Sequence, residues 1–137
     1  MKLSVKIEYS CRVLAQMARL HELGEMAHIE GLSQAEEIPS NYLAQILAEL
    51  RNAGLISSKR GKKGGYSLSR APKDISLLDI MQAIDGEVLS FTRNSGGFSA
   101  PKVEEALQGL KEAFEKAARG KTLDQLVPAE SGGMYYI

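Results

Sequence analysis

The 137-residue sequence contains a single cysteine, Cys11, so no disulfide can form within the chain. Its first residues lack an apolar core of signal-peptide length, and no apolar run approaches the length needed to cross a bilayer. We therefore expect a cytoplasmic protein without a membrane segment. Catalytic motifs are missing as well: there is no nucleophile elbow or pair of metal ligands, and residues 61–65 lack the spacing of a phosphate-binding loop. These absences argue against an enzyme.

A further absence is local. Residues 51–73 contain no Asp or Glu, although they hold seven Lys/Arg in a chain whose formal net charge is +0. Residues 1–73 carry a balance of +4 and residues 74–137 a balance of −4, so the charge is divided between two halves. A basic half suits contact with nucleic acid, and an acidic half suits another task. The length predicts one domain, or one domain with an assembly element.

Apolar spacing and turn residues predict a mainly α-helical chain with one small β-hairpin. The first helix should bury Leu3, Ile7 and Cys11, and the second should bury Leu32 and Ala35. Helices are expected over residues 3–23, 26–39, 41–52, 76–86, from 101 onward and over 122–127, with strands over 55–59 and 66–70.

A short helix, a tight turn and a longer helix form a helix-turn-helix, and a basic hairpin after it is typical of a wing. The fold class expected is a winged helix-turn-helix with a long C-terminal dimerisation helix. We expect a winged-helix DNA-binding domain over residues 1–86, a loop and dimerisation helix over 87–127, and a tail over 128–137.

The long C-terminal helix carries apolar residues at alternating four- and three-residue spacing, which is a heptad pattern. Such a face packs either on its own domain or on the same helix of a second subunit. Because the preceding segments already suffice for a core, we favour a homodimer. The residues of this predicted interface are Val103, Leu107, Leu110, Phe114 and Ala117.

Four motifs occur in an order that resembles the Rrf-two family of winged-helix transcription regulators, which includes the IscR, NsrR and CymR types. They are MKLS at residues 1–4, PSNYLAQILAELRNAGLI at 39–56, SKRGKKGGYSLSRAP at 58–72 and ISLLDIMQAIDG at 75–86. The Gly64-Gly65-Tyr66 run matches the wing of most members. The resemblance implies a dimeric regulator, most simply a repressor, that binds double-stranded DNA at a palindromic operator.

A recognition helix offers hydrogen-bonding side chains to base edges near its N-terminus. Ser40, Asn41 and Gln45 occupy that place, whereas Ala44 has no group to offer; solvated helix residues are the alternative interpretation.

The wing supplies the remaining predicted contacts. Arg60 suits the minor groove, and Gly61, Gly64 and Gly65 are expected to provide positive φ and close backbone approach at the tip. The other wing residues expected to contact DNA, mostly its phosphates, are Lys59, Gly61, Lys62, Lys63 and Gly64. The resemblance also implies that the flanking phosphates are bound by three residues of the first helix, namely Lys2, Tyr9 and Arg12, because their counterparts in the family do so.

The iron–sulphur members of the family carry three cysteines in the loop before the long helix, because a cluster needs several thiolates. Residues 87–100 contain none, so we expect no metal and no cofactor. Cys11 is then either a small buried hydrophobe or a redox-sensing thiol.

The sequence ends in Met134-Tyr135-Tyr136-Ile137, and aromatic residues are good interface anchors. CymR-type members lack cluster cysteines and work with cysteine synthase, whose partners end in an isoleucine that enters its active site. The resemblance thus implies that Tyr135, Tyr136 and Ile137 form a partner-binding tail; packing of the tail on its own dimer is the alternative.

Two other functions stay open from the sequence. One is a regulator that senses oxidation through Cys11, or a small ligand in a pocket by the long helix. The other is a protein-interaction module with a degenerate DNA face, which the acid-free basic run disfavours.

Overall fold

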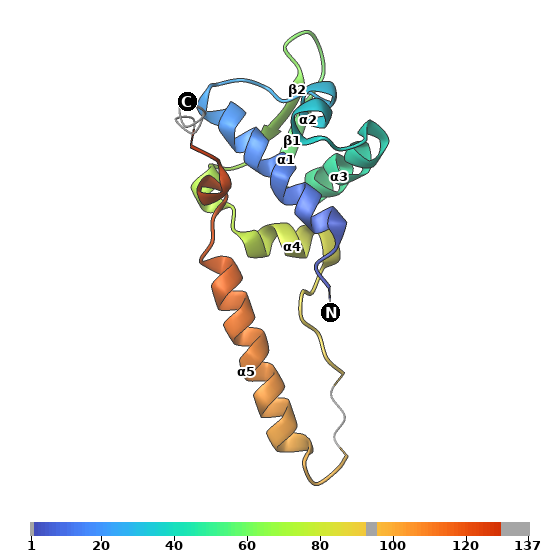
Figure 1. Cartoon of the computed structure of the whole chain (residues 1–137), viewed down its shortest axis with the longest axis vertical. Helices are drawn as coiled ribbons and strands as arrows, with labels where there is room; N and C mark the ends of the chain where they lie inside the picture. The colour runs from blue at the N-terminus through green and yellow to red at the C-terminus, as the bar shows by residue number, and fades with distance from the viewer. Residues whose placement is uncertain (1, 93–95, 130–137) are drawn as a thin grey trace, which may run out of the picture.

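A computed structural model describes residues 2–92 and 96–129, and within them the chain is mainly helical with one antiparallel hairpin (Figure 1). This confirms the predicted helical fold class with a β-hairpin wing and a long C-terminal helix, and the dimerisation role of that helix stays a prediction. The elements in chain order are α1 (Val5–Glu22), α2 (Ile29–Glu36), α3 (Ser40–Asn52), β1 (Ile56–Lys59), β2 (Gly65–Leu68), the 3-10 turn η1 (Pro72–Asp74), α4 (Leu77–Asp85), α5 (Ala100–Arg119) and the 3-10 turn η2 (Leu123–Leu126).

Local side chains determine where the helices begin. The Ser4 hydroxyl accepts a hydrogen bond from the Ile7 amide at the start of α1. Helix α4 begins with a reciprocal capping box: the Asp79 amide donates to the Ser76 hydroxyl at 3.0 Å, and the Ser76 amide donates to the Asp79 carboxylate at 2.8 Å. Each bond satisfies a backbone amide that the helix itself cannot pair.

The main core lies between α1, α3, α4 and the hairpin. Its fully buried side chains include Leu14, Leu47, Ile56 and Ile80. Leu123 of η2, which follows the long helix, is also fully buried in this core. Backbone hydrogen bonds from the Leu77 amide to the Lys121 carbonyl and from the Leu123 amide to the Ile75 carbonyl, both 2.8 Å, hold this segment against the start of α4.

Two expected core positions are wrong. Leu3 lies before α1 and is 66% exposed, because the cap at Ser4 starts the helix after it. Ala35 is exposed because α2 has only eight residues and buries Leu32 alone.

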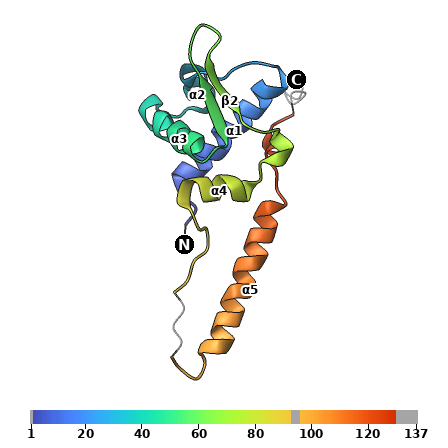
Figure 2. The same ribbon diagram turned by 180° about the vertical axis from the view of Figure 1, so that it is seen from behind.

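Helix α5 extends away from the hairpin, and both views show that its N-terminal half stands apart from the helices of the core (Figures 1 and 2). Its C-terminal half packs on α1 and α4, where Ala118 joins a second small core of Ile7, Leu78 and Met81, with Phe114 against it. None of the described helices is long and apolar enough to span a bilayer.

Candidate nucleic-acid interface

Helix α3 has one buried and one exposed face. Leu43, Ile46, Leu47 and Leu50 are fully buried, which leaves the opposite side of the helix toward solvent. The exposed residues on its first two turns are Ser40, Asn41, Ala44 and Gln45. The structure therefore brings the predicted base-contacting side chains together on one accessible surface.

The turn between α2 and α3 is held by hydroxyl groups. The Ser33 hydroxyl donates to the Ile38 carbonyl at 2.5 Å, and the Ser40 hydroxyl donates to the Ser33 oxygen at 3.2 Å. Glu37 in this turn has φ +54°, and among the described residues no other non-glycine has positive φ. A left-handed glutamate costs conformational energy, so the surrounding contacts must offset that cost to hold Glu37 in this conformation.

Arg12 and Tyr9 of α1 support the same turn. The Arg12 guanidinium donates to the Glu36 carbonyl at 3.0 Å, pairs with Glu8 at 3.2 Å and lies 4.7 Å over the Tyr9 ring. The Tyr9 ring in turn meets Tyr42 of α3 edge-on, with centroids 5.6 Å apart. No local pattern in the sequence predicts this chain of contacts, because its members come from three helices.

The wing is the hairpin β1–β2, with its register set by Ile56 opposite Leu68 and Lys59 opposite Gly65. A further antiparallel bridge joins Tyr66 to Ala27, the segment before α2, through hydrogen bonds of 2.7 and 2.8 Å. Lys59, Arg60, Lys62 and Lys63 are all exposed at the tip, which projects from the end of the molecule opposite to α5 (Figure 1). The four cations thus form one accessible cluster.

Glycine is needed in the wing for two different reasons. Gly61 and Gly65 have positive φ, as predicted, at +103° and +132°. Gly64 does not, which corrects the φ expected for that residue, whereas the expected close backbone approach is confirmed there. It is instead buried in the turn, where an added Cβ would lie 2.2 Å from the Lys59 carbonyl oxygen and 2.8 Å from the Gly61 carbonyl oxygen.

Gly64→Ala is expected to distort the wing tip while leaving the core folded. A methyl group cannot occupy a site 2.2 Å from a backbone oxygen, so the tip must open. Such strain costs about 1–3 kcal/mol, and we expect DNA affinity to fall about tenfold or more. Fluorescence anisotropy with labelled DNA and a thermal melt measure the two effects. Gly109→Ala, at an open position inside α5, is the control: DNA affinity should stay unchanged, and the melting temperature should stay the same or rise, because alanine favours the helix more than glycine does.

Lys2 lies apart from this surface. It borders a small pocket with Ile7, Asp85 of α4 and Phe114 of α5, and α5 extends from the end of the molecule opposite to the wing (Figure 1). The structure thus does not bring Lys2 together with the wing, and its predicted phosphate contact stays a prediction.

A helix-turn-helix with an exposed polar recognition face, followed by a basic hairpin, defines a winged helix-turn-helix of the DNA-binding class. The family model Rrf2, described as "Iron-dependent Transcriptional regulator", matches residues 3–129. The chain therefore belongs to the Rrf2 family, whose members are transcription regulators and not enzymes.

Individual proteins agree with this assignment. A helix-turn-helix regulator of Mycobacterium tuberculosis H37Rv is 38% identical over 90 residues, 66% of this chain and 55% of that protein, so the chain spans about half the length of this relative. CymR of Bacillus subtilis is 28% identical over 141 residues, covering 100% of both chains. The solved structure of CymR, the global cysteine regulator of B. subtilis, aligns with a TM-score of 0.78 at 27% identity and covers 92% of this chain and 95% of that one. The structure of T. potens IscR aligns with a TM-score of 0.74 at 27% identity and covers 99% of this chain and 97% of that one.

The family description mentions iron, and the residues of this chain do not fit an iron–sulphur cluster. Such clusters are held mainly by several cysteine thiolates, whereas Cys11 is the single cysteine of the sequence. Within residues 2–92 and 96–129, no three His, Cys, Asp or Glu side chains are grouped so as to hold a metal ion. We derive no role for iron in this chain.

Cys11 lies half-buried on α1, packed against both core clusters. Burial raises the pKa of its thiol to about 11, and the neighbouring Glu8 carboxylate acts in the same direction. Because the thiolate is the reactive form of cysteine, these surroundings disfavour a redox sensor at this position.

The thiol of Cys11 is expected to react with DTNB at pH 7.5 about a hundredfold more slowly than free cysteine, since its thiolate fraction is lower by a similar factor. Absorbance at 412 nm follows the reaction with DTNB, with the urea-unfolded chain as the control. A native rate equal to the unfolded rate would restore Cys11 as a candidate sensor.

The raised pKa of Cys11 also affects folding stability. The stability attributable to the neutral thiol is present below about pH 9 and is lost as the pH rises toward 11.

Proposed function

We propose that this regulator is a cytoplasmic homodimeric repressor that binds an operator of two-fold symmetry. The observation that carries the proposal is the separation of two surfaces. Helix α3 and the wing lie toward one end of the molecule, and the N-terminal half of α5 lies at the other (Figure 2). The first end exposes polar and cationic side chains, and α5 exposes apolar ones. Two copies joined through α5 would leave both DNA-facing ends free.

At each half-site, α3 enters the major groove. Asn41 and Gln45 hydrogen-bond base edges, a pairing that amide side chains make best with adenine. Ser40 contributes at the first turn, although its hydroxyl already donates to Ser33. Arg60 probes the minor groove, and Lys59, Lys62 and Lys63 bind phosphates. The protein contacts of Arg12 favour a supporting role for that residue, and its predicted phosphate contact stays a proposal.

The dimer interface is the heptad face of α5. Val103, Leu107 and Leu110 are 51%, 40% and 63% exposed in the single chain. Apolar residues at this spacing are buried when two such helices pack together. Phe114 is half-buried against the second core and Ala117 is exposed, so the interface we propose is strongest toward the N-terminal half of α5.

Selection of bound sequences from a random DNA library tests the proposal. We expect recovered sequences to contain two inverted half-sites, because a two-fold protein requires a two-fold site. The variant Asn41→Ala with Gln45→Ala is the matched control, and it should still bind DNA but recover no motif. Recovery of a single asymmetric site by the unaltered protein would contradict the dimeric mode of binding.

For the signal, we propose control of cysteine metabolism through cysteine synthase. The support is the alignment over the full length of B. subtilis CymR and the lack of a cluster-binding set of cysteines. The predicted partner-binding tail, Tyr135 to Ile137, lies outside the described residues.

Gel shifts of promoter DNA with and without cysteine synthase test this partnership. The enzyme should tighten DNA binding by the full chain and not by a chain that lacks residues 135–137. A synthetic peptide of residues 128–137 should inhibit the synthase, and a scrambled peptide should not. If the full chain and the shortened chain respond alike, the tail has no part in the signal.

A further inference from the structure

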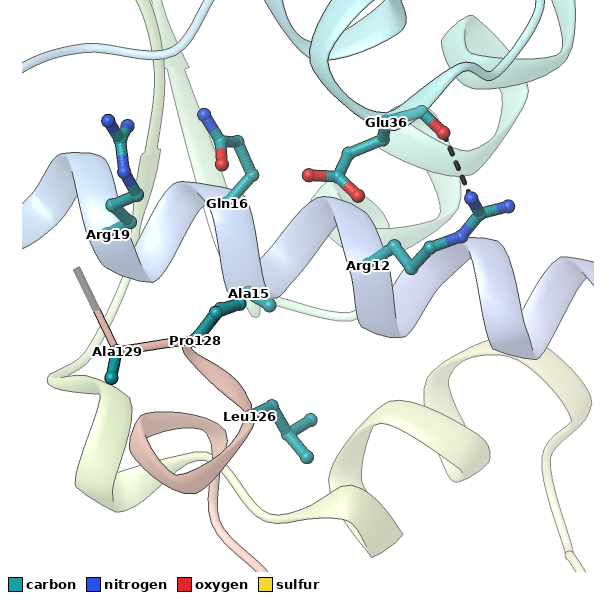
Figure 3. A pocket seen from close by; sticks show the side chains of 8 residues that line it. All are labelled: Arg12, Ala15, Gln16, Arg19, Glu36, Leu126, Pro128 and Ala129. Carbon is teal, nitrogen blue, oxygen red and sulfur yellow. Dashed lines mark hydrogen bonds between the residues drawn. The ribbon is translucent and has the colours of Figure 1, made fainter. Parts of the chain in front are cut away.

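A groove crosses the outer surface of α1, between the end of α2 and the segment that follows α5 (Figure 3). We refer to it as the α1 groove. Its volume is about 430 Å³, which falls in the range of roughly 300–1,000 Å³ typical of small-molecule sites. None of its lining residues belongs to α5 or to the wing tip.

The polar lining of the α1 groove carries charges of both signs. Arg12, Gln16 and Arg19 follow at four- and three-residue spacing and share one face of α1. They extend over about 10 Å of helix. Glu36 faces them from the end of α2, and Figure 3 shows the Glu36 and Gln16 side chains directed into the same space. A cationic and an anionic group therefore line one groove.

The other wall is apolar. Leu126 of η2 and Pro128 approach α1 beside Ala15 (Figure 3). This wall exists because η2 is anchored in the main core through Leu123. A ligand matching the groove has an anionic group, a cationic group and a small apolar part.

We infer that the α1 groove binds an α-amino acid. Arg19 and Gln16 receive its carboxylate, since a guanidinium makes strong, charge-assisted hydrogen bonds to carboxylates. Glu36 holds its ammonium group, and the amino-acid side chain packs on Leu126 and Pro128.

The surroundings of Glu36 agree with a cationic ligand. Desolvation raises the pKa of the Glu36 carboxyl, a shift that Arg12 opposes and Glu8 reinforces. A carboxylate that is partly withdrawn from water gains more from an ammonium partner than an exposed one does.

The α1 groove is also joined to the DNA-facing helix. Arg12 lines the groove and donates to the Glu36 carbonyl, one residue before the left-handed Glu37 of the turn. It lies over Tyr9, which contacts Tyr42 of α3. A ligand that binds Arg12 or Glu36 thus changes the contacts that position α3, and we expect DNA affinity to change with occupancy of the α1 groove. This coupling rests on the proposed function, whereas ligand binding itself does not.

Titration of the full chain with each of the twenty amino acids, followed by calorimetry and ¹H–¹⁵N NMR, tests the inference. At least one should bind with a Kd below about 1 mM, so titration to about 10 mM gives saturation. Its shifts should map to residues 12–19 and 36. Glu36→Gln should weaken binding at least tenfold, and Glu30→Gln, an exposed acid on the same helix outside the groove, should not. Acetate and methylamine, each carrying half of the recognition group, should bind more weakly.

Failure of all twenty amino acids to bind would overturn the inference, as would equal binding of acetate or shifts that map elsewhere. Gel shifts with and without the bound amino acid separate this result from the proposed function. If the ligand binds in the groove but no DNA is bound, the proposed function fails alone. If DNA binds and the groove stays empty, only the groove inference fails.

Discussion

Replacing Lys59, Lys62 and Lys63 together by alanine is expected to lower DNA affinity on the order of a thousandfold at about 100 mM salt. All three side chains are exposed at the wing tip, so their loss leaves the core intact. Each lost phosphate contact reduces the slope of log K against log salt by about 0.9. A dimer loses two copies of each lysine, so the slope should flatten by about five.

Fluorescence anisotropy at several salt concentrations measures both quantities. The matched control replaces Lys102, Lys116 and Lys121 by alanine, which removes the same charge from the C-terminal part of the chain. If the wing variant and this control show the same salt slope, the wing does not lie on phosphates. In that case the affinity resides in α3 and the wing is only a structural hairpin.

Replacing Leu107 and Leu110 by glutamate is expected to convert a dimer into monomers. Both side chains are substantially exposed in the single chain, so the change should leave the fold of the monomer intact. Burying four carboxylates between two α5 helices is strongly unfavourable. Loss of the second half-site should weaken operator binding by a factor of about 10²–10⁴, the usual gain from linking two binding modules.

Light scattering on a size-exclusion column gives the mass, and anisotropy gives the affinity. Gly109→Glu with Lys116→Gln is the control: it makes the same change in charge on the opposite face of α5. The control should remain dimeric. If the leucine variant stays dimeric too, another surface holds the subunits together.

Much of the fold follows from neighbours along the chain. The capping box of α4 joins residues three apart, and the wing turn depends on glycines within residues 61–65. The wrong predictions for single residues arise where one short sequence pattern is compatible with two local structures. Leu3 fits the apolar spacing of α1, but the cap at Ser4 excludes it from the helix. Gly64 resembles its neighbours, although close backbone contact, and not φ, is what requires glycine there.

The candidate DNA surface was predictable for the same reason. Ser40, Asn41 and Gln45 are exposed because the leucines and isoleucine of α3 occupy its other face. The stack of Arg12, Tyr9 and Tyr42, and the pairing of Ala27 with Tyr66, were not predictable, since each joins segments distant in sequence.

By itself, therefore, the sequence determined the helix-turn-helix, the cationic wing and the apolar heptad of α5, because periodicity, caps and glycines act over a few residues. Only the tertiary structure decided which distant segments those elements pack against. The return of Leu123 to the core brings Leu126 and Pro128 opposite α1 and Glu36, and so creates a groove from segments that are far apart in the sequence. Such contacts depend on how the core closes, since packing and desolvation act between side chains in space without regard to their order in the chain.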